Sequence, residues 1–65
     1  MPTARYMVRR DLDQCVIHTQ RIQNYLTRTG RLYEADHSDI YKLFCMIMAL
    51  VDQAEQALRE LRGHI

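Results

Sequence analysis

Apolar residues in the first half of the chain return at alternating intervals of four and three positions, the heptad spacing of a helix that packs against another helix. Thr19 is the one polar member of this series, and Val16 widens the apolar stripe. We therefore expect a long helix whose packing edge is formed by Val8, Leu12, Cys15, Thr19, Ile22 and Leu26.

The second half of the chain follows the same spacing without a polar member. Neither half shows strand-like alternation, an internal repeat or a linker. The pattern predicts a second helix of similar length, with a packing edge formed by Ile40, Phe44, Ile47, Val51, Ala54, Leu58, Leu61 and Ile65.

Two residues compete for the start of the first helix. Thr3 follows Pro2 and suits the N-cap of a long helix, whereas Asp11 with Gln14 has the form of a capping box for a shorter one. The regular heptad position of Val8 favours the longer helix.

Turn signals separate the two helices. Gly30 suits the residue after the first helix, where a left-handed conformation ends a helix at little cost. Asp36 or Ser38 is expected to cap the second helix, with Asp39 in its first turn, where the helix dipole favours an acid. The predicted ranges are 4–29 for the first helix, 30–37 for the turn and 38–63 for the second helix.

A connection this short folds the helices into an antiparallel hairpin within a single domain. In the second helix, the stretch LFCMIMALV carries no charge, although 26% of the chain is charged. One neighbouring helix cannot cover apolar side chains on nearly all sides, and 65 residues bury little surface alone. We expect an all-α antiparallel helical hairpin dimerising into a four-helix bundle, in preference to a monomeric hairpin with an exposed apolar patch. The predicted dimer core comprises Leu43, Met46, Ile47, Leu50 and Val51.

The charge of the chain is small but unevenly distributed. Residues 1–31 carry six arginines against two aspartates, about +4, and residues 32–65 carry three basic against six acidic side chains, about −3. A basic helix beside an acidic one is favourably paired. The net charge of +1 does not by itself indicate a nucleic-acid or membrane partner.

The start of the chain lacks the layout of a signal peptide, because no apolar segment follows its basic residues. The longest apolar run stops at Asp52, well short of the roughly 20 residues of a membrane span. We therefore expect a cytoplasmic protein without a membrane partner.

No set of side chains suggests catalysis. The sequence has no Gly-rich phosphate loop and no HExxH pattern, and two long helices offer few converging groups. We expect no enzymatic activity, no small-molecule substrate and no cofactor.

The two cysteines and nearby histidines raise the question of a zinc site. In a hairpin that turns near residue 34, Cys15 and Cys45 lie about eight residues, or roughly 12 Å, apart along the axis. That separation is too long for a disulfide or a zinc site within one chain. We expect no metal, and two small buried apolar cysteines; a site between subunits is the alternative.

Several exposed positions are candidates for binding another protein. Ile17 is apolar on the outer surface of the first helix, and tyrosines near the turn offer amphipathic rings of the kind enriched at interfaces. The tyrosines have an equally good alternative role in closing the end of the bundle. The predicted partner-binding residues are Ile17, Tyr25, Tyr33 and Tyr41.

A row of basic side chains on the first helix gives a second functional hypothesis. Arg10, Arg21 and Arg28 fall on one outer face with Asn24 nearby, and such a row can track phosphates, although it is more often a solvated surface. In length and hairpin architecture the chain resembles small plasmid-type RNA-binding regulators of the Rop kind, without a matching residue motif.

Together these features favour a small non-enzymatic homodimer that binds another protein and inhibits, sequesters or chaperones it. The alternative is a Rop-like RNA-binding regulatory bundle that uses the basic row.

Overall fold

The computed structural model describes residues 4–65 of the chain. Helix α1 spans Ala4–Gly30 and helix α2 spans Ser38–His64. A short 3-10 helix, η1 (Arg31–Tyr33), and residues 34–37 connect them. The described part of the chain is therefore all-α and contains two long helices, as the heptad pattern predicts.

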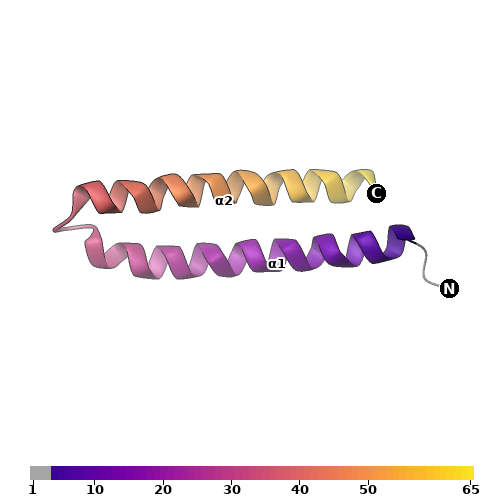
Figure 1. The fold of residues 1–65 in the computed structure, drawn as a ribbon, viewed down its shortest axis with the longest axis horizontal. Helices are drawn as coiled ribbons and strands as arrows, with labels where there is room; N and C mark the ends of the chain where they lie inside the picture. Colours follow the sequence, from indigo (N-terminus) through magenta and orange to yellow (C-terminus); the bar gives the residue numbers. More distant parts are fainter. Residues whose placement is uncertain (1–3) are drawn as a thin grey trace.

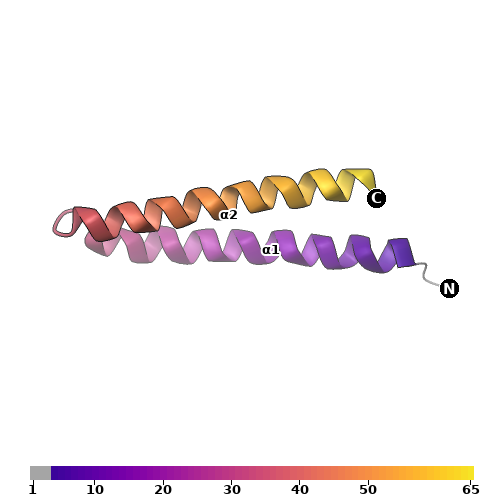
Figure 2. The ribbon, with the colours of Figure 1, turned by 45° about the horizontal axis from the view of Figure 1, so that its top comes forward.

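The two helices run antiparallel and side by side, with the connection at one end and both termini at the other (Figures 1 and 2). They form a single layer that measures 55 × 16 × 10 Å. The radius of gyration is 15.4 Å, against about 10.7 Å for a compact chain of this length. The hairpin is thus an elongated layer one helix thick.

The predicted helix caps fare differently. Because α1 is already helical at Ala4, Asp11 lies inside it, and the predicted cap Thr3 lies outside the described residues. At the second helix, the N-cap is His37 and not Asp36 or Ser38. The backbone decides this position, because the His37 N–H donates to the Tyr33 carbonyl at 3.1 Å and closes the turn there.

The role predicted for Gly30 is wrong. Its φ of −62° and ψ of −32° are right-handed helical values, so it remains part of α1. Gly30 is instead buried against Phe44 of α2, and a Cβ at this position would lie 3.3 Å from Phe44 Cγ. Glycine is needed here for close approach rather than for a left-handed turn.

The hairpin contact uses only part of the predicted packing edges. The least exposed residues of both helices keep the three-four spacing. They alternate between a residue of the predicted packing edge and a residue that is only a sequence neighbour of that edge. Several of these neighbours are polar. In α1, the predicted Leu12, Thr19 and Leu26 alternate with Arg9, Val16 and Gln23. In α2, the predicted Phe44, Val51, Leu58 and Ile65 alternate with Tyr41, Met48, Glu55 and Arg62.

The register of the hairpin also differs from the prediction. Thr19 Oγ1 donates to Glu55 Oε1 at 3.2 Å, and the Arg9 guanidinium donates to the Ile65 carbonyl. Both pairs are centred on His37 rather than on residue 34, because α1 continues to Gly30 and η1 adds a further turn.

Polar side chains contribute much of the contact between the helices. Gln23 Nε2 donates to the Met48 carbonyl at 2.9 Å, and Arg62 Nε donates to Asp13 Oδ1 at 3.0 Å. Partly exposed ion pairs of this kind stabilise a fold by only about 0–1 kcal/mol. Leu12 is the one apolar residue of 4–65 that the hairpin buries. The single chain therefore has a very small hydrophobic core.

We predict that Gly30→Leu lowers the free energy of unfolding by about 1–3 kcal/mol, because its side chain displaces the Phe44 ring. Gly63→Leu is the matched control, since a Cβ at Gly63 meets nothing within 4 Å. Urea unfolding followed by circular dichroism, at one chain concentration, compares the two variants. Equal stabilities would contradict the close-approach role of Gly30.

Candidate interaction surfaces

The contact edge divides the hairpin into two faces of different character. Residues that directly follow Leu12 and Leu58, namely Asp13 and Arg59, line one depression together, so these positions lie on the same side of the layer. By contrast, the residues that directly precede the contact positions in the sequence, such as Cys15 before Val16 and Ile47 before Met48, lie on the opposite side of the layer. We call this second side the apolar face; Asp11 and His18 share it, and its apolar residues are Val8, Cys15, Ile22, Ile40, Leu43, Met46, Ile47, Leu50, Ala54 and Leu61.

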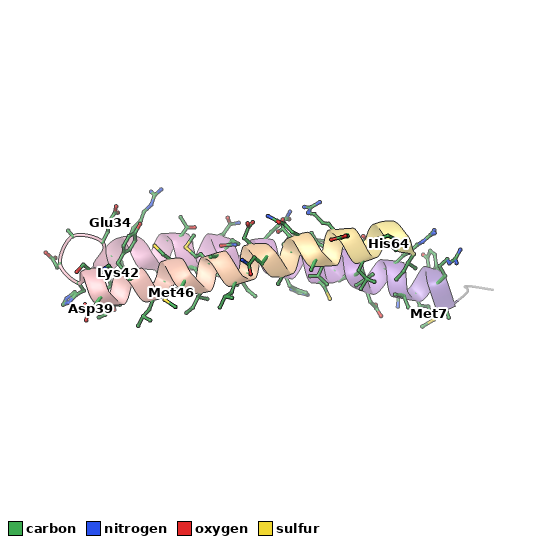
Figure 3. All side chains as sticks on the ribbon, turned by 90° about the horizontal axis from the view of Figure 1, so that it is seen from above. Met7, Glu34, Asp39, Lys42, Met46 and His64 are labelled. Carbon is green, nitrogen blue, oxygen red and sulfur yellow. The ribbon has the colours of Figure 1, made fainter. Side chains whose placement is uncertain are left out.

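The apolar face contains four of the five residues predicted to form a dimer core. Their exposed fractions are 58% for Leu43, 61% for Met46, 47% for Ile47 and 63% for Leu50. Val51 is half-buried on the contact edge with α1. In Figure 3, Met46 of α2 and Met7 of α1 project toward the same side of the layer, opposite the side of Glu34. Both helices thus contribute exposed apolar side chains to this side.

The exposed area of the chain is large for its mass. It amounts to 5355 Å², about 1000 Å² more than the roughly 4400 Å² expected of a compact monomer of 7.8 kDa. The hairpin therefore leaves uncovered an area comparable to one side of a standard protein interface, about 800 Å².

The opposite side, which we call the polar face, carries the residues Asp13, Ile17, Gln20, Thr27, Cys45, Asp52 and Arg59. It is hollowed at two places. Near the chain ends, a depression of about 390 Å³ is lined by Asp13, Val16, Ile17, Arg59, Arg62 and Gly63. Near the connection, a depression of about 410 Å³ is lined by Leu26, Thr27, Gly30, Arg31, Glu34, Tyr41, Phe44 and Met48.

The structure separates the four predicted partner-binding residues. Ile17 and Tyr41 line the two different depressions of the polar face. Tyr33 stacks on Phe44 with 5.8 Å between ring centroids and so closes the end of the hairpin. Tyr25 lies two turns away on the outer surface of α1 and is 61% exposed.

Tyr41 also contacts a cysteine. A hydrogen bond with the Cys45 side chain, aided by the nearby Glu34 carboxylate, raises the pKa of the Tyr41 hydroxyl above its ordinary value. Both Cys15 and Cys45 are free and exposed in the single chain, so the hairpin by itself buries neither of them. They lie on opposite faces of the layer, Cys15 on the apolar face and Cys45 on the polar face.

Three of the four predicted nucleic-acid-binding residues come together. Arg21, Asn24 and Arg28 line a shallow depression of about 270 Å³ with Tyr25, and the Arg28 guanidinium carbon lies 5.1 Å from the Tyr25 ring centroid. Arg10 lies outside this depression and is 3.8 Å from the Asp11 carboxylate.

Within residues 4–65, no three side chains of the metal-binding types come together. Neither helix of that range combines the length and hydrophobicity of a membrane span. No protein-family model, curated protein or solved structure matches the chain.

Sequence reasoning missed the depression around Ile17, because it placed the hairpin centre at the wrong residue. With the centre at residue 34, Asp13 lies opposite residue 55 and not near Arg59 and Arg62. The opposite charges of Asp13 and Arg62, which bond at 3.0 Å, are the signal that favours the observed register.

Proposed function

We propose that this chain is a non-enzymatic protein-interaction module. Its apolar face packs against a second copy to form a homodimeric four-helix bundle, and its polar face binds another protein. The exposure of Leu43, Met46, Ile47 and Leu50 on one side of the hairpin is the observation that supports this function most directly.

A second copy is the simplest partner for the apolar face. Stable domains contain at least two packed layers of secondary structure, and the hairpin supplies one. Two copies related by a two-fold axis supply the second layer, each with the same apolar face. The excess exposed area of about 1000 Å² is enough for a standard interface in such a dimer.

The polar face stays accessible in this dimer, because it lies on the other side of the layer. Its depressions combine apolar and charged side chains: Ile17 lies beside Asp13 and Arg59, and Tyr41 lies beside Glu34 and Arg31. Mixed apolar and polar surfaces of this kind are typical of non-obligate protein interfaces. A partner bound there is inhibited, sequestered or held in a folded state without a chemical step.

We predict that Ile47→Asp abolishes self-association, because it places an unpaired carboxylate in the centre of the buried interface. Ala49→Asp, two residues along on an exposed position outside the apolar face, is the matched control. Light scattering after size-exclusion chromatography should give the mass of two chains for the native protein and the control, and of one chain for Ile47→Asp. A native protein with the mass of one chain would refute the dimer.

The two cysteines provide a native probe of which face is covered. In single-cysteine chains, Cys15 in the Cys45→Ser variant should react slowly with a thiol reagent, and Cys45 in the Cys15→Ser variant should react rapidly. Adding Ile47→Asp should accelerate Cys15 alone, because only the apolar face is uncovered. Rapid reaction of Cys15 in a chain of dimer mass would place the interface elsewhere.

Binding of the partner protein is expected to depend on the polar face and not on the dimer contact. We predict that the immobilised native chain retains a protein from a lysate of its source and that the Ile17→Asp variant does not retain it. The variant should keep the mass of the dimer. Gln14→Asp, an exposed position of the same helix outside this depression, should retain that protein. Retention by both variants, or by neither, would contradict the role of Ile17.

A further inference from the structure

We infer that the outer surface of α1 is a binding site for single-stranded nucleic acid. Arg21 and Arg28 contact phosphates of the strand, and Tyr25 stacks on a base. This site lies apart from both faces used in the proposed function and does not depend on self-association.

The first argument is the distribution of charge. Residues 14–33 contain three arginines and not one aspartate or glutamate. Within residues 4–65, none of these three arginines forms an ion pair. The arginines that do contact an acidic side chain lie outside this segment; they are Arg10 with Asp11, Arg59 with Glu55 and Arg62 with Asp13. The segment therefore presents unneutralised positive charge, which attracts a polyanion.

The second argument is spacing. Arg21, Asn24 and Arg28 follow one another at intervals of three and four, so they form one row along α1. At 1.5 Å per residue, the row from Arg21 to Arg28 is about 10 Å long. At roughly 3.4 Å per nucleotide of a strand, this length spans about three nucleotides.

The third argument is the aromatic group beside the row. Tyr25 lines the same depression as Arg21 and Arg28, and its ring is 61% exposed although Arg28 lies over it. An exposed ring between free arginines is the combination with which proteins bind unpaired bases. Asn24, on the same depression, can both donate to and accept from a base edge.

These features favour a single strand over the other polyanions of a cell. An acidic peptide or an anionic lipid surface satisfies the arginines but gives the Tyr25 ring no flat partner. In a duplex the bases are stacked on one another and are not available to the ring. Arg21, Asn24, Tyr25 and Arg28 are exposed, and α2 contributes no residue to the depression that they line, so both copies of the site are expected to remain open in a dimer.

The experiment is fluorescence anisotropy of a labelled 12-nucleotide strand of mixed sequence, titrated with the full chain. RNA and DNA strands of the same sequence identify which source of single strand binds more tightly. A matched 12-base-pair RNA duplex is the competitor. We expect single strands to bind more tightly than the duplex, with log K falling against log salt concentration at a slope of about −1.4 for two phosphate contacts. Tighter binding of the duplex, or no binding of any strand, would overturn the inference.

Variants separate a built site from diffuse attraction. Arg21→Ala should reduce the steepness of the salt slope by about 0.7. Tyr25→Ala should weaken binding roughly 5- to 150-fold, and Tyr25→Phe, which keeps the ring, should bind as the native chain does. Arg10→Ala removes the same charge from the same helix at an arginine next to Asp11, and should leave the slope unchanged.

Equal effects of Arg10→Ala and Arg21→Ala would show general electrostatic attraction and overturn the site. The site would also be overturned if the Arg21→Ala variant no longer bound the partner protein but still bound the strand as the native chain does. Helical content, measured by circular dichroism, confirms that each variant is folded. Dimer mass is measured on the same samples, so that failure of this site and failure of the proposed dimer are distinguished.

Discussion

A layer of two helices has no interior, and this constraint governs the rest of the molecule. Each helix has a single edge in contact with the other, so most side chains of both helices remain in water. Among residues 4–65 the hairpin buries one apolar side chain, Leu12. Burial of apolar area is the main favourable term in folding, and a chain of this size has little of it to gain alone. The uncovered apolar face is the direct consequence.

The contact that holds the layer together is selective rather than strong. Gly30 lets the backbone of α1 approach the Phe44 ring, which also stacks on Tyr33. Along the remaining contact edge, side-chain bonds between the helices, such as those from Gln23 to the Met48 carbonyl and from Arg62 to Asp13, depend on the register. Polar groups on this edge therefore fix how the helices align, and the purely apolar positions are left for the face that the proposed dimer covers.

Angular position around each helix separates the surfaces of this chain. On α1, Ile22 belongs to the apolar face, Ile17 to the polar face, and Arg21 and Arg28 to the outer surface between them. Because neighbouring positions in a helix differ by about 100°, adjacent residues can serve different surfaces. A chain of 65 residues can in this way carry the proposed self-association face, the proposed partner face and a charged outer surface at once.

The sequence by itself determined that the chain forms two long helices joined by a short turn, because three-four spacing and turn residues act locally. It also indicated that the second helix is apolar on more than one side, since the run from Leu43 to Val51 carries no charge. Only the tertiary structure decided which edge faces the other helix. Two adjacent stripes share Leu12, Thr19 and Leu26, and both have heptad spacing, so periodicity cannot distinguish them. The choice between them, and the register centred on His37, depends on contacts between residues far apart in the chain, such as Asp13 with Arg62 and Gly30 with Phe44.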